Sequence, residues 1–519
     1  MRDGAQSEGV SFSTEDKLEV MQRLDDFGID FIEGGYPGSN PKDEQFFQAA
    51  KRRKLKHAKL VAFGSTRKAN IKAAEDKGMR SLADAGTEWV AIFGKSWDMQ
   101  LEKALQCSVE EGVEIVSDSV SFLRSKRKKV IFDAEHYFDG WKSNPKFSMK
   151  VLEAAAEAGA EYLVLCDTNG GTYPSDVQKA VRQVAKRFDL PLGIHAHNDS
   201  ELAVANSLAA LEAGAEMVQG TINGLGERCG NANLCSIIPT LVLKMGARTS
   251  IPDLTQLTPL SRFVGEIANI EPDPRSPFVG RSAFAHKGGM HVSAVLKDTR
   301  TYEHMVPELV GNQRRILISE LAGTASLLAK SKELGIDTEK DSGKEILEKL
   351  KQMESEGFQF EAAEASLELL IRKLKGLQEQ PFQLSGFRLF MDVGGPTTIS
   401  EASIRVVDHN GNVEHTAADG NGPVNALDRA LRKALTKFYP VLSEVRLIDY
   451  KVRVIDGKDA TAAKVRVLIR STDGRSSWTT IGVSGNIIEA SLMALMDSIE
   501  YKLMKSGING ASLKRRKES

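Results

Sequence analysis

The sequence predicts an α/β protein that begins with a (β/α)8 barrel, its first strand missing, and ends in a smaller α+β domain. Three observations predict this. Short apolar runs alternate with amphipathic stretches from residue 29 to about 225, polar residues follow these runs, and after residue 381 strands precede a helix, twice. At 519 residues the chain exceeds one compact core, so more than one domain is expected.

The apolar runs in the first half are the predicted strands. Each run is followed by Gly, Asn or Ser and then by a charged amphipathic stretch, such as 148–158. This alternation predicts parallel strands joined by right-handed crossovers. An eighth strand before residue 1 would complete a barrel. The predicted strands are 30–33, 60–63, 89–93, 130–133, 162–166, 192–195 and 217–222.

Polar residues gather where these strands end, as in Asp133-Ala134-Glu135 and in the run from His195 to Asp199. In a barrel, the carboxyl ends of all strands meet at one mouth, where catalytic residues lie. A doubly wound open sheet would place polar residues only near one switch point. The barrel is therefore the favoured architecture.

After residue 262 the regular alternation of apolar runs and amphipathic stretches ends. Prolines interrupt residues 263–280, charged helices are predicted at 338–350 and 361–377, and Asn410-Gly411 marks a hairpin between strands. Helices at 424–437 and 487–503 complete the α+β pattern. We predict a catalytic barrel at 1–262, a helical linker region contributing to the active site at 263–380 and an effector-binding dimer domain at 381–510.

Composition excludes several classes of protein. The 69 basic and 70 acidic residues give a net charge of −1 without a basic face for nucleic acid. No apolar stretch is long enough to span a membrane, and no secretory signal is recognisable. Four cysteines without CxxC spacing suit a reduced protein, so we expect a cytoplasmic location.

His195 and His197 occupy alternate positions of a predicted strand, so both side chains point to the same side of the sheet. Two such imidazoles could begin a divalent metal site, completed by Asp3 and Asn231. Two hydrogen-bonded core histidines would show the same spacing. These ligand types suit Mg²⁺, Mn²⁺ and Zn²⁺ alike.

A metal with open positions could bind a 2-oxo acid through its keto and carboxylate oxygens and polarise the carbonyl. Arg2 could neutralise the oxyanion that develops during attack, although a second residue is usually exposed. Thr168 could bind the substrate carboxylate, although a Thr after a strand is more often a helix N-cap.

Four motifs together resemble one enzyme family. They are RDGAQSEGVSFS at 2–13, CDTNGG at 166–171, HAHND at 195–199 and GERCGNANL at 226–234. In this order they resemble the 2-isopropylmalate, homocitrate and citramalate synthases, the Claisen-condensing relatives of hydroxymethylglutaryl-CoA lyase. DGNGPVNAL and SGNIIEASLMAL, within 382–505, resemble that family's C-terminal domain. FGSTR, FGKSW and DAEHYFDGW are most similar to the citramalate branch.

The resemblance implies roles for individual residues. The metal ligands would be Asp3, His195 and His197, with Asn231 in or next to the metal shell. The remaining matches are Arg2 for catalysis and substrate binding, Thr168 for substrate binding, and Glu135, His291 and Tyr302 for catalysis. His291 and Tyr302 would act in the partner subunit. Glu135 and His291 are both candidate bases, and the proton steps are not divided between them.

The implied reaction condenses acetyl-CoA with pyruvate and water to give citramalate and CoA, in isoleucine biosynthesis. A homodimer with a branched-chain amino-acid effector is the implied assembly. Two alternatives stay open: a 2-isopropylmalate synthase acting on 2-oxoisovalerate in leucine biosynthesis, and an inactive amino-acid-binding regulatory protein. The family's strand before RDG is missing here, so we expect a gap in the barrel and Asp3 on a free terminus.

Overall fold

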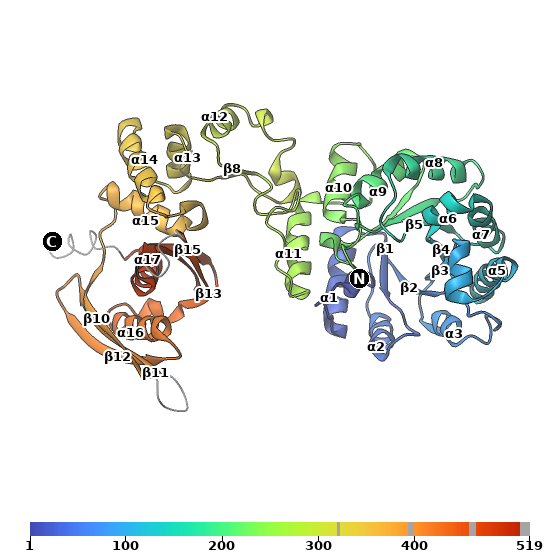
Figure 1. Cartoon of the computed structure of the whole chain (residues 1–519), viewed down its shortest axis with the longest axis horizontal. Helices are drawn as coiled ribbons and strands as arrows, with labels where there is room; N and C mark the ends of the chain where they lie inside the picture. The colour runs from blue at the N-terminus through green and yellow to red at the C-terminus, as the bar shows by residue number, and fades with distance from the viewer. Residues whose placement is uncertain (319–321, 393–398, 456–462, 509–519) are drawn as a thin grey trace. The chain divides into compact units, whose positions relative to one another are not determined.

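The structure, a computed structural model, describes residues 1–318, 322–392, 399–455 and 463–508 (Figure 1). The chain divides into two compact units. The first comprises Met1–Phe284 and Met305–Arg314, and the second comprises Ala285–His304 and Arg315–Ser519. The segment 285–304 therefore belongs with the C-terminal part of the chain.

The first unit contains a parallel sheet of seven strands in the order β1 to β7. Every predicted strand is present; six extend one or two residues beyond the predicted carboxyl end, and β7 ends at Gln219, before its predicted end. The parallel-stranded barrel architecture is confirmed. The strands are β1 (Phe31–Gly35), β2 (Lys59–Ser65), β3 (Trp89–Lys95), β4 (Lys129–Glu135), β5 (Tyr162–Asp167), β6 (Leu192–Ala196) and β7 (Met217–Gln219).

Helices pack around the outside of these strands (Figure 1). Local signals define their ends: the first helix has a capping box between Ser13 and Asp16 and stops at Gly28, whose φ is 99°. The helices are α1 (Thr14–Phe27), α2 (Pro41–Ala50), α3 (Lys77–Asp84), α4 (Asp98–Gln100), α5 (Val109–Ser125), α6 (Tyr137–Ser143), α7 (Pro145–Glu157), α8 (Pro174–Ala185), α9 (Ala203–Glu212), α10 (Leu234–Leu243) and α11 (Leu257–Ile267), with short turns η1 (Gly4–Gln6), η2 (Leu101–Leu105), η3 (Ile222–Gly224), η4 (Leu254–Gln256) and η6 (Pro307–Val310).

Alternate residues of the strands point into the barrel. Val61, Trp89, Ile131 and Val164 form part of a buried cluster there. Because side chains alternate along a strand, residues with the same parity near the carboxyl ends also face inward. This parity brings the polar residues of several strands to one mouth.

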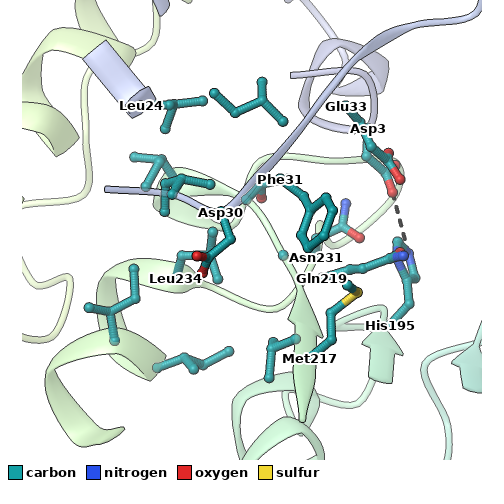
Figure 2. Close-up of a pocket in the computed structure, with 18 of the residues that line it drawn as sticks. Asp3, Leu24, Asp30, Phe31, Glu33, His195, Met217, Gln219, Asn231 and Leu234 are labelled. Atoms are coloured by element: carbon teal, nitrogen blue, oxygen red, sulfur yellow. Dashed lines mark hydrogen bonds and ion pairs between the residues drawn. The ribbon is translucent and has the colours of Figure 1, made fainter. Parts of the chain in front are cut away.

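The sheet is open between β1 and β7, which are its two edge strands among the described residues. A cavity of about 900 Å³ lies between these edges, lined by Phe31 and Glu33 on one side and by Met217 and Gln219 on the other. Figure 2 shows Leu24 further along its wall. The predicted gap in the barrel is therefore confirmed.

The second unit begins with a two-residue parallel pairing of β8 and β9 and continues through helices into two antiparallel sheets. Its elements are β8 (Ala285–His286), α12 (Gly289–Lys297), η5 (Thr299–Thr301), β9 (Arg315–Ile316), α13 (Thr324–Glu333), α14 (Lys340–Ser355), η7 (Phe360–Ala362), α15 (Glu364–Leu374), β10 (Phe382–Asp392), β11 (Ile399–Asp408), β12 (Val413–Gly420), α16 (Pro423–Phe438), η8 (Pro440–Glu444), β13 (Arg446–Val454), β14 (Val465–Thr472), β15 (Ser477–Ser484) and α17 (Ile487–Lys505).

The last part repeats one motif, three antiparallel strands followed by a helix. Helix α16 packs on β11 and β12, and α17 packs on β14 and β15, around one apolar cluster. The predicted hairpin is confirmed, because Asp408 accepts hydrogen bonds from the N–H groups of Asn410 and Asn412 at the turn between β11 and β12. Among the described residues, no helix is long and apolar enough to cross a membrane.

The open edge of the barrel gives a first prediction. The backbone N–H of Arg2 donates to the Glu33 carbonyl at 3.1 Å, so Arg2 lies beside β1. Adding about five apolar residues before Met1 should place a strand between β1 and β7, bury apolar surface and raise the Tm by several degrees. Thermal unfolding would measure this, with an extension of Gly and Ser of equal length as the control. Equal Tm values for the apolar and the Gly/Ser extensions would show that no strand forms in the cavity between β1 and β7.

Candidate metal and substrate site

The carboxylate of Asp3 and the imidazoles of His195 and His197 come together at the barrel mouth. His195 Nε2 lies 3.3 Å from Asp3 Oδ2 and 3.3 Å from His197 Nε2. All three residues are buried, and their ligand atoms lie within 4.8 Å of one another. Figure 2 shows Asp3 and His195 facing each other at one end of the cavity.

These residues fit a divalent metal. Donors about 2.0–2.2 Å from one ion, at the angles usual for metal sites, lie about 3 Å apart, as these atoms do. Several buried polar atoms of the described residues have no hydrogen-bond partner, and among them are Asp3 Oδ2, His197 Nδ1 and Asn231 Oδ1 of the predicted metal ligands. A buried oxygen left without a partner is costly, and a cation would satisfy it. The Asn231 oxygen is therefore available to a ligand, and its role as the fourth metal ligand stays a prediction.

The protonation states also suit a metal. Burial, followed by the neighbouring His195, lowers the pKa of His197 from 6.5 to about 4, so its ring is neutral near pH 7. Burial alone would raise the pKa of Asp3, but the charges of Arg2 and of the two histidines outweigh it and lower that pKa. A neutral imidazole and a charged carboxylate are the ligand forms that bind metal.

A hydrogen-bonded chain behind His195 fixes the orientation of its ring. Gln219 Nε2 donates to Asp133 Oδ1 at 2.9 Å, so Gln219 Oε1 accepts the proton of His195 Nδ1 at 2.8 Å. This arrangement leaves the lone pair of His195 on Nε2, the atom that faces Asp3. Burial and the nearby Glu33 raise the pKa of Asp133 well above its usual value.

Arg2 is held in place on three sides. Its Nε and Nη2 contact Glu33 Oε2 at 3.0 and 2.9 Å, its Nη1 lies 3.3 Å from Asp3, and its Cζ lies 3.6 Å from the centre of the Phe63 ring. The Arg2 side chain is only 14% exposed, so it is not the free terminal group that its position in the sequence would suggest. A fixed guanidinium at this mouth can stabilise negative charge.

The loop after β7 closes the site through two glycines. A Cβ on Gly226 would lie 2.0 Å from Asn231 Nδ2, and Gly230 has a φ of 90° with its own Cβ position 2.0 Å from the Gly224 carbonyl. Ser7 ties the N-terminal segment to this loop, since its hydroxyl donates to the Gly226 carbonyl and accepts from the Gly226 N–H. Larger residues at either glycine would displace Asn231.

Two further predicted residues lie at the same end of the barrel. Glu135 forms an ion pair with Lys95 from the neighbouring strand β3. The Thr168 hydroxyl accepts the N–H of His136 at 2.8 Å, so its own proton remains available to a ligand. Thr168 therefore receives a backbone N–H from another strand end and does not act as a helix N-cap.

His291 and Tyr302 lie in the second unit, where their rings stack with centroids 4.2 Å apart. Tyr302 is 49% exposed. The pair is built from α12 and the segment that follows it. The two rings are therefore in contact within the second unit, and their catalytic roles stay predictions.

Sequence reasoning missed Gln219 and Lys95 as partners of site residues. Lys95 was visible only as a polar residue at a strand end, and Gln219 was hidden inside a predicted strand. The parity of Gln219 with Met217, which lines the barrel, was the signal that could have revealed it.

Family models match three consecutive parts of the chain. A model described as HMGL-like matches residues 1–264, and one described as the homocitrate synthase post-HMGL domain matches residues 278–357. A third, the LeuA allosteric (dimerisation) domain, matches residues 361–503.

Full-length relatives agree with these matches. The chain is 56% identical to an (R)-citramalate synthase of Aquifex aeolicus, covering 98% of each chain. It is 53% identical to an (R)-citramalate synthase of Geobacter sulfurreducens, covering 98% of this chain and 97% of the relative. A 2-isopropylmalate synthase of Methanocaldococcus jannaschii is 31% identical over 97% of this chain and 94% of the relative.

The Gln219 hydrogen bonds give a second prediction. Replacing Gln219 by Ala should weaken Mn²⁺ binding about 10- to 100-fold, because His195 then loses the partner that fixes its tautomer. Titration calorimetry would measure the affinity. Gln178→Ala is the matched control, since Gln178 lies on α8 and bonds Glu212 at an exposed position. Equal affinities in both variants would contradict a role for Gln219 in metal binding.

The pKa of His197 gives a third prediction. As the pH falls below 6.5, His197 becomes protonated in the unfolded chain, whereas in the folded chain it is protonated only near pH 4. The free energy of unfolding of the metal-free protein should therefore fall as the pH drops through this window, by at most about 3 kcal/mol. Urea unfolding with EDTA would measure it. His197→Gln should flatten this part of the profile, and an unchanged slope would contradict the assignment.

Proposed function

This chain belongs to the HMGL-like family, and we propose that it is a metal-dependent acyltransferase that condenses acetyl-CoA with pyruvate and water to give citramalate and CoA. The observation that carries the proposal is the buried cluster of Asp3, His195 and His197 with the unsatisfied oxygen of Asn231. A divalent ion there, Mg²⁺, Mn²⁺ or Zn²⁺, would polarise the keto group of a bound 2-oxo acid.

The side chains at the mouth suit the charges of this reaction. Arg2, fixed by Glu33, would stabilise the oxyanion that forms when the enolate of acetyl-CoA attacks the keto carbon. Thr168 would donate its free hydroxyl proton to the substrate carboxylate. Both groups are oriented before substrate arrives, which reduces the entropy lost in reaching the transition state.

Proton transfer falls to Glu135 and to His291 with Tyr302. One base must remove a methyl proton from acetyl-CoA, and water must be activated to hydrolyse the thioester formed by condensation. Glu135 forms an ion pair with Lys95 of the neighbouring strand, which holds its carboxylate at the barrel mouth. The stacked pair of His291 and Tyr302 lies in a different unit, and we propose that it serves the active site of a partner subunit.

Pyruvate is proposed as the acceptor on two grounds. The relatives of highest identity reported above are named (R)-citramalate synthases, whereas the 2-isopropylmalate synthase is more distant. In addition, the rings of Phe63 and Phe93 stack with centroids 5.6 Å apart, Phe63 lies against Arg2, and we propose that these rings limit the space for the acceptor's side chain. A single methylene in such a pocket changes discrimination by about 1–3 kcal/mol.

The remaining predictions form part of the same proposal. Residues 1–262 would carry the metal site, 263–380 would supply His291, and 381–510 would form a homodimer and bind a branched-chain amino-acid effector, as the LeuA match supports. A role in isoleucine biosynthesis follows from the proposed product. All four cysteines are free thiols, which supports a cytoplasmic location.

A fourth prediction tests the reaction. CoA release from acetyl-CoA, followed with a thiol reagent, should require a divalent metal, stop with EDTA and be fastest with pyruvate in a series from glyoxylate to 2-oxoisovalerate. Asp3→Asn should lower the rate at least about 100-fold, because the ligand charge is lost. Asp26→Asn, at an exposed ion pair with Lys56, should leave it unchanged.

Other outcomes of this experiment would change the proposal. Preference for 2-oxoisovalerate would overturn pyruvate as acceptor and leave the metal chemistry standing. Absence of CoA release with every acid, together with absence of pyruvate binding, would favour the amino-acid-binding regulatory protein.

A further inference from the structure

A second cavity, of about 530 Å³, lies within the C-terminal unit. It is formed by the end of α14, by η7, by the ends of β13 and β14 that lie next to each other, and by Lys287 before α12. Its volume lies within the range that holds small ligands. The site proposed above uses none of its residues.

Positive charge dominates the lining of this cavity. Four cationic side chains and two carboxylates line it, and Lys287 Nζ lies 2.8 Å from Glu361. The pocket therefore holds more positive than negative charge. The cations are Lys287, Lys351, Arg453 and Arg466, and the carboxylates are Glu354 and Glu361.

Two of the cations are directly opposite each other on neighbouring strands. Arg453 of β13 and Arg466 of β14 are direct partners in the antiparallel register. Like charges at opposed positions destabilise a sheet. Burial, followed by the charge of Arg453, lowers the pKa of Arg466. Glu354 and Glu361 offset part of this repulsion, and a bound anion would offset more of it.

Arg466 is already oriented. Its Nε donates to the Gly357 carbonyl at 2.6 Å and its Nη1 donates to Gln359 Oε1 at 2.8 Å. Its Nη2 donates to none of the residues that the structure describes, so N–H groups remain for a ligand. A guanidinium fixed in this way matches the paired oxygens of a carboxylate or phosphate and loses little entropy on binding.

We propose that this pocket is a binding site for a small organic dianion, a dicarboxylate or a phosphate ester, held by Arg453, Arg466 and Lys351. The volume exceeds that of a bare inorganic ion, which favours an organic molecule. Lys287 lies four positions before His291 on the same segment. A dianion that competes with Glu361 for Lys287 would therefore act on the segment that carries His291, and this last step alone rests on the proposed function.

Binding to the full-length protein provides the fifth prediction. Malonate and glycerol phosphate serve as dicarboxylate and phosphate probes, with acetate as the monoanion control, all at one ionic strength. We expect one of the two dianions to raise the Tm and to bind in titration calorimetry, which also identifies the ligand class. Arg453→Gln and Lys351→Gln should each weaken binding about tenfold, since each removes a charge-assisted hydrogen bond.

Lys349→Gln is the matched control, because Lys349 is exposed on α14 and does not line the cavity. It should bind the dianion as the unaltered chain does. Without ligand, Arg453→Gln should leave the Tm unchanged or raise it, because the repulsion with Arg466 is gone. Failure of both dianions to bind, an equal effect of acetate, or unchanged affinity in Arg453→Gln would overturn the proposal. None of these readouts depends on catalysis.

Discussion

The charge of Asp3, buried at the barrel mouth, is the constraint on which the site depends. A carboxylate with 7% exposure is stable as an anion only when neighbouring groups compensate for its lost hydration. Here the compensation comes from Arg2, the two histidines and a hydrogen bond from Asn231, which together lower the pKa of Asp3. Arg2 forms ion pairs with both Asp3 and Glu33, and Lys95 forms an ion pair with Glu135. Of the two histidines beside Asp3, His197 is neutral near pH 7.

The surrounding structure holds these groups where a cation could bind to the ligand atoms of Asp3, His195 and His197. The raised pKa of Asp133 means that burial favours its protonated form, so it adds less negative charge than its position suggests. It still anchors Gln219, which in turn orients His195. Gly226 leaves room for the Asn231 amide, whose hydrogen bond contributes to the lowered pKa of Asp3. Backbone geometry and electrostatics therefore select the same centre.

Much of this could be predicted from the sequence because parallel strands are buried on both faces. Their apolar runs are continuous and end at turn residues, so the strands could be located to within a few residues. Parity along β6 was sufficient to place His195 and His197 on one side. The pairing of Gln219 with Asp133 could not be predicted, because 86 residues separate them and no local pattern links them.

The division of the chain into two compact units also depends on contacts between residues far apart in the sequence, and could not be predicted. The segment with His291 follows the barrel in sequence but belongs to the C-terminal unit, joined there by the two-residue pairing of β8 and β9 and by the ion pair of Lys287 with Glu361. Such short pairings leave almost no periodic signal in the sequence. Contacts between distant residues decide which unit carries the segment.

Net charge is equally uninformative about binding. The chain as a whole carries −1, yet the barrel mouth gathers carboxylates and the second cavity gathers arginine and lysine. Within one cavity the local balance of charge influences which ligand binds, because the lining charges lie close to one another and to the ligand. An anion in the second cavity would relieve a like-charge repulsion that the fold maintains at a cost in stability. The cross-strand pair of Arg453 and Arg466 is the most direct sign of that cost.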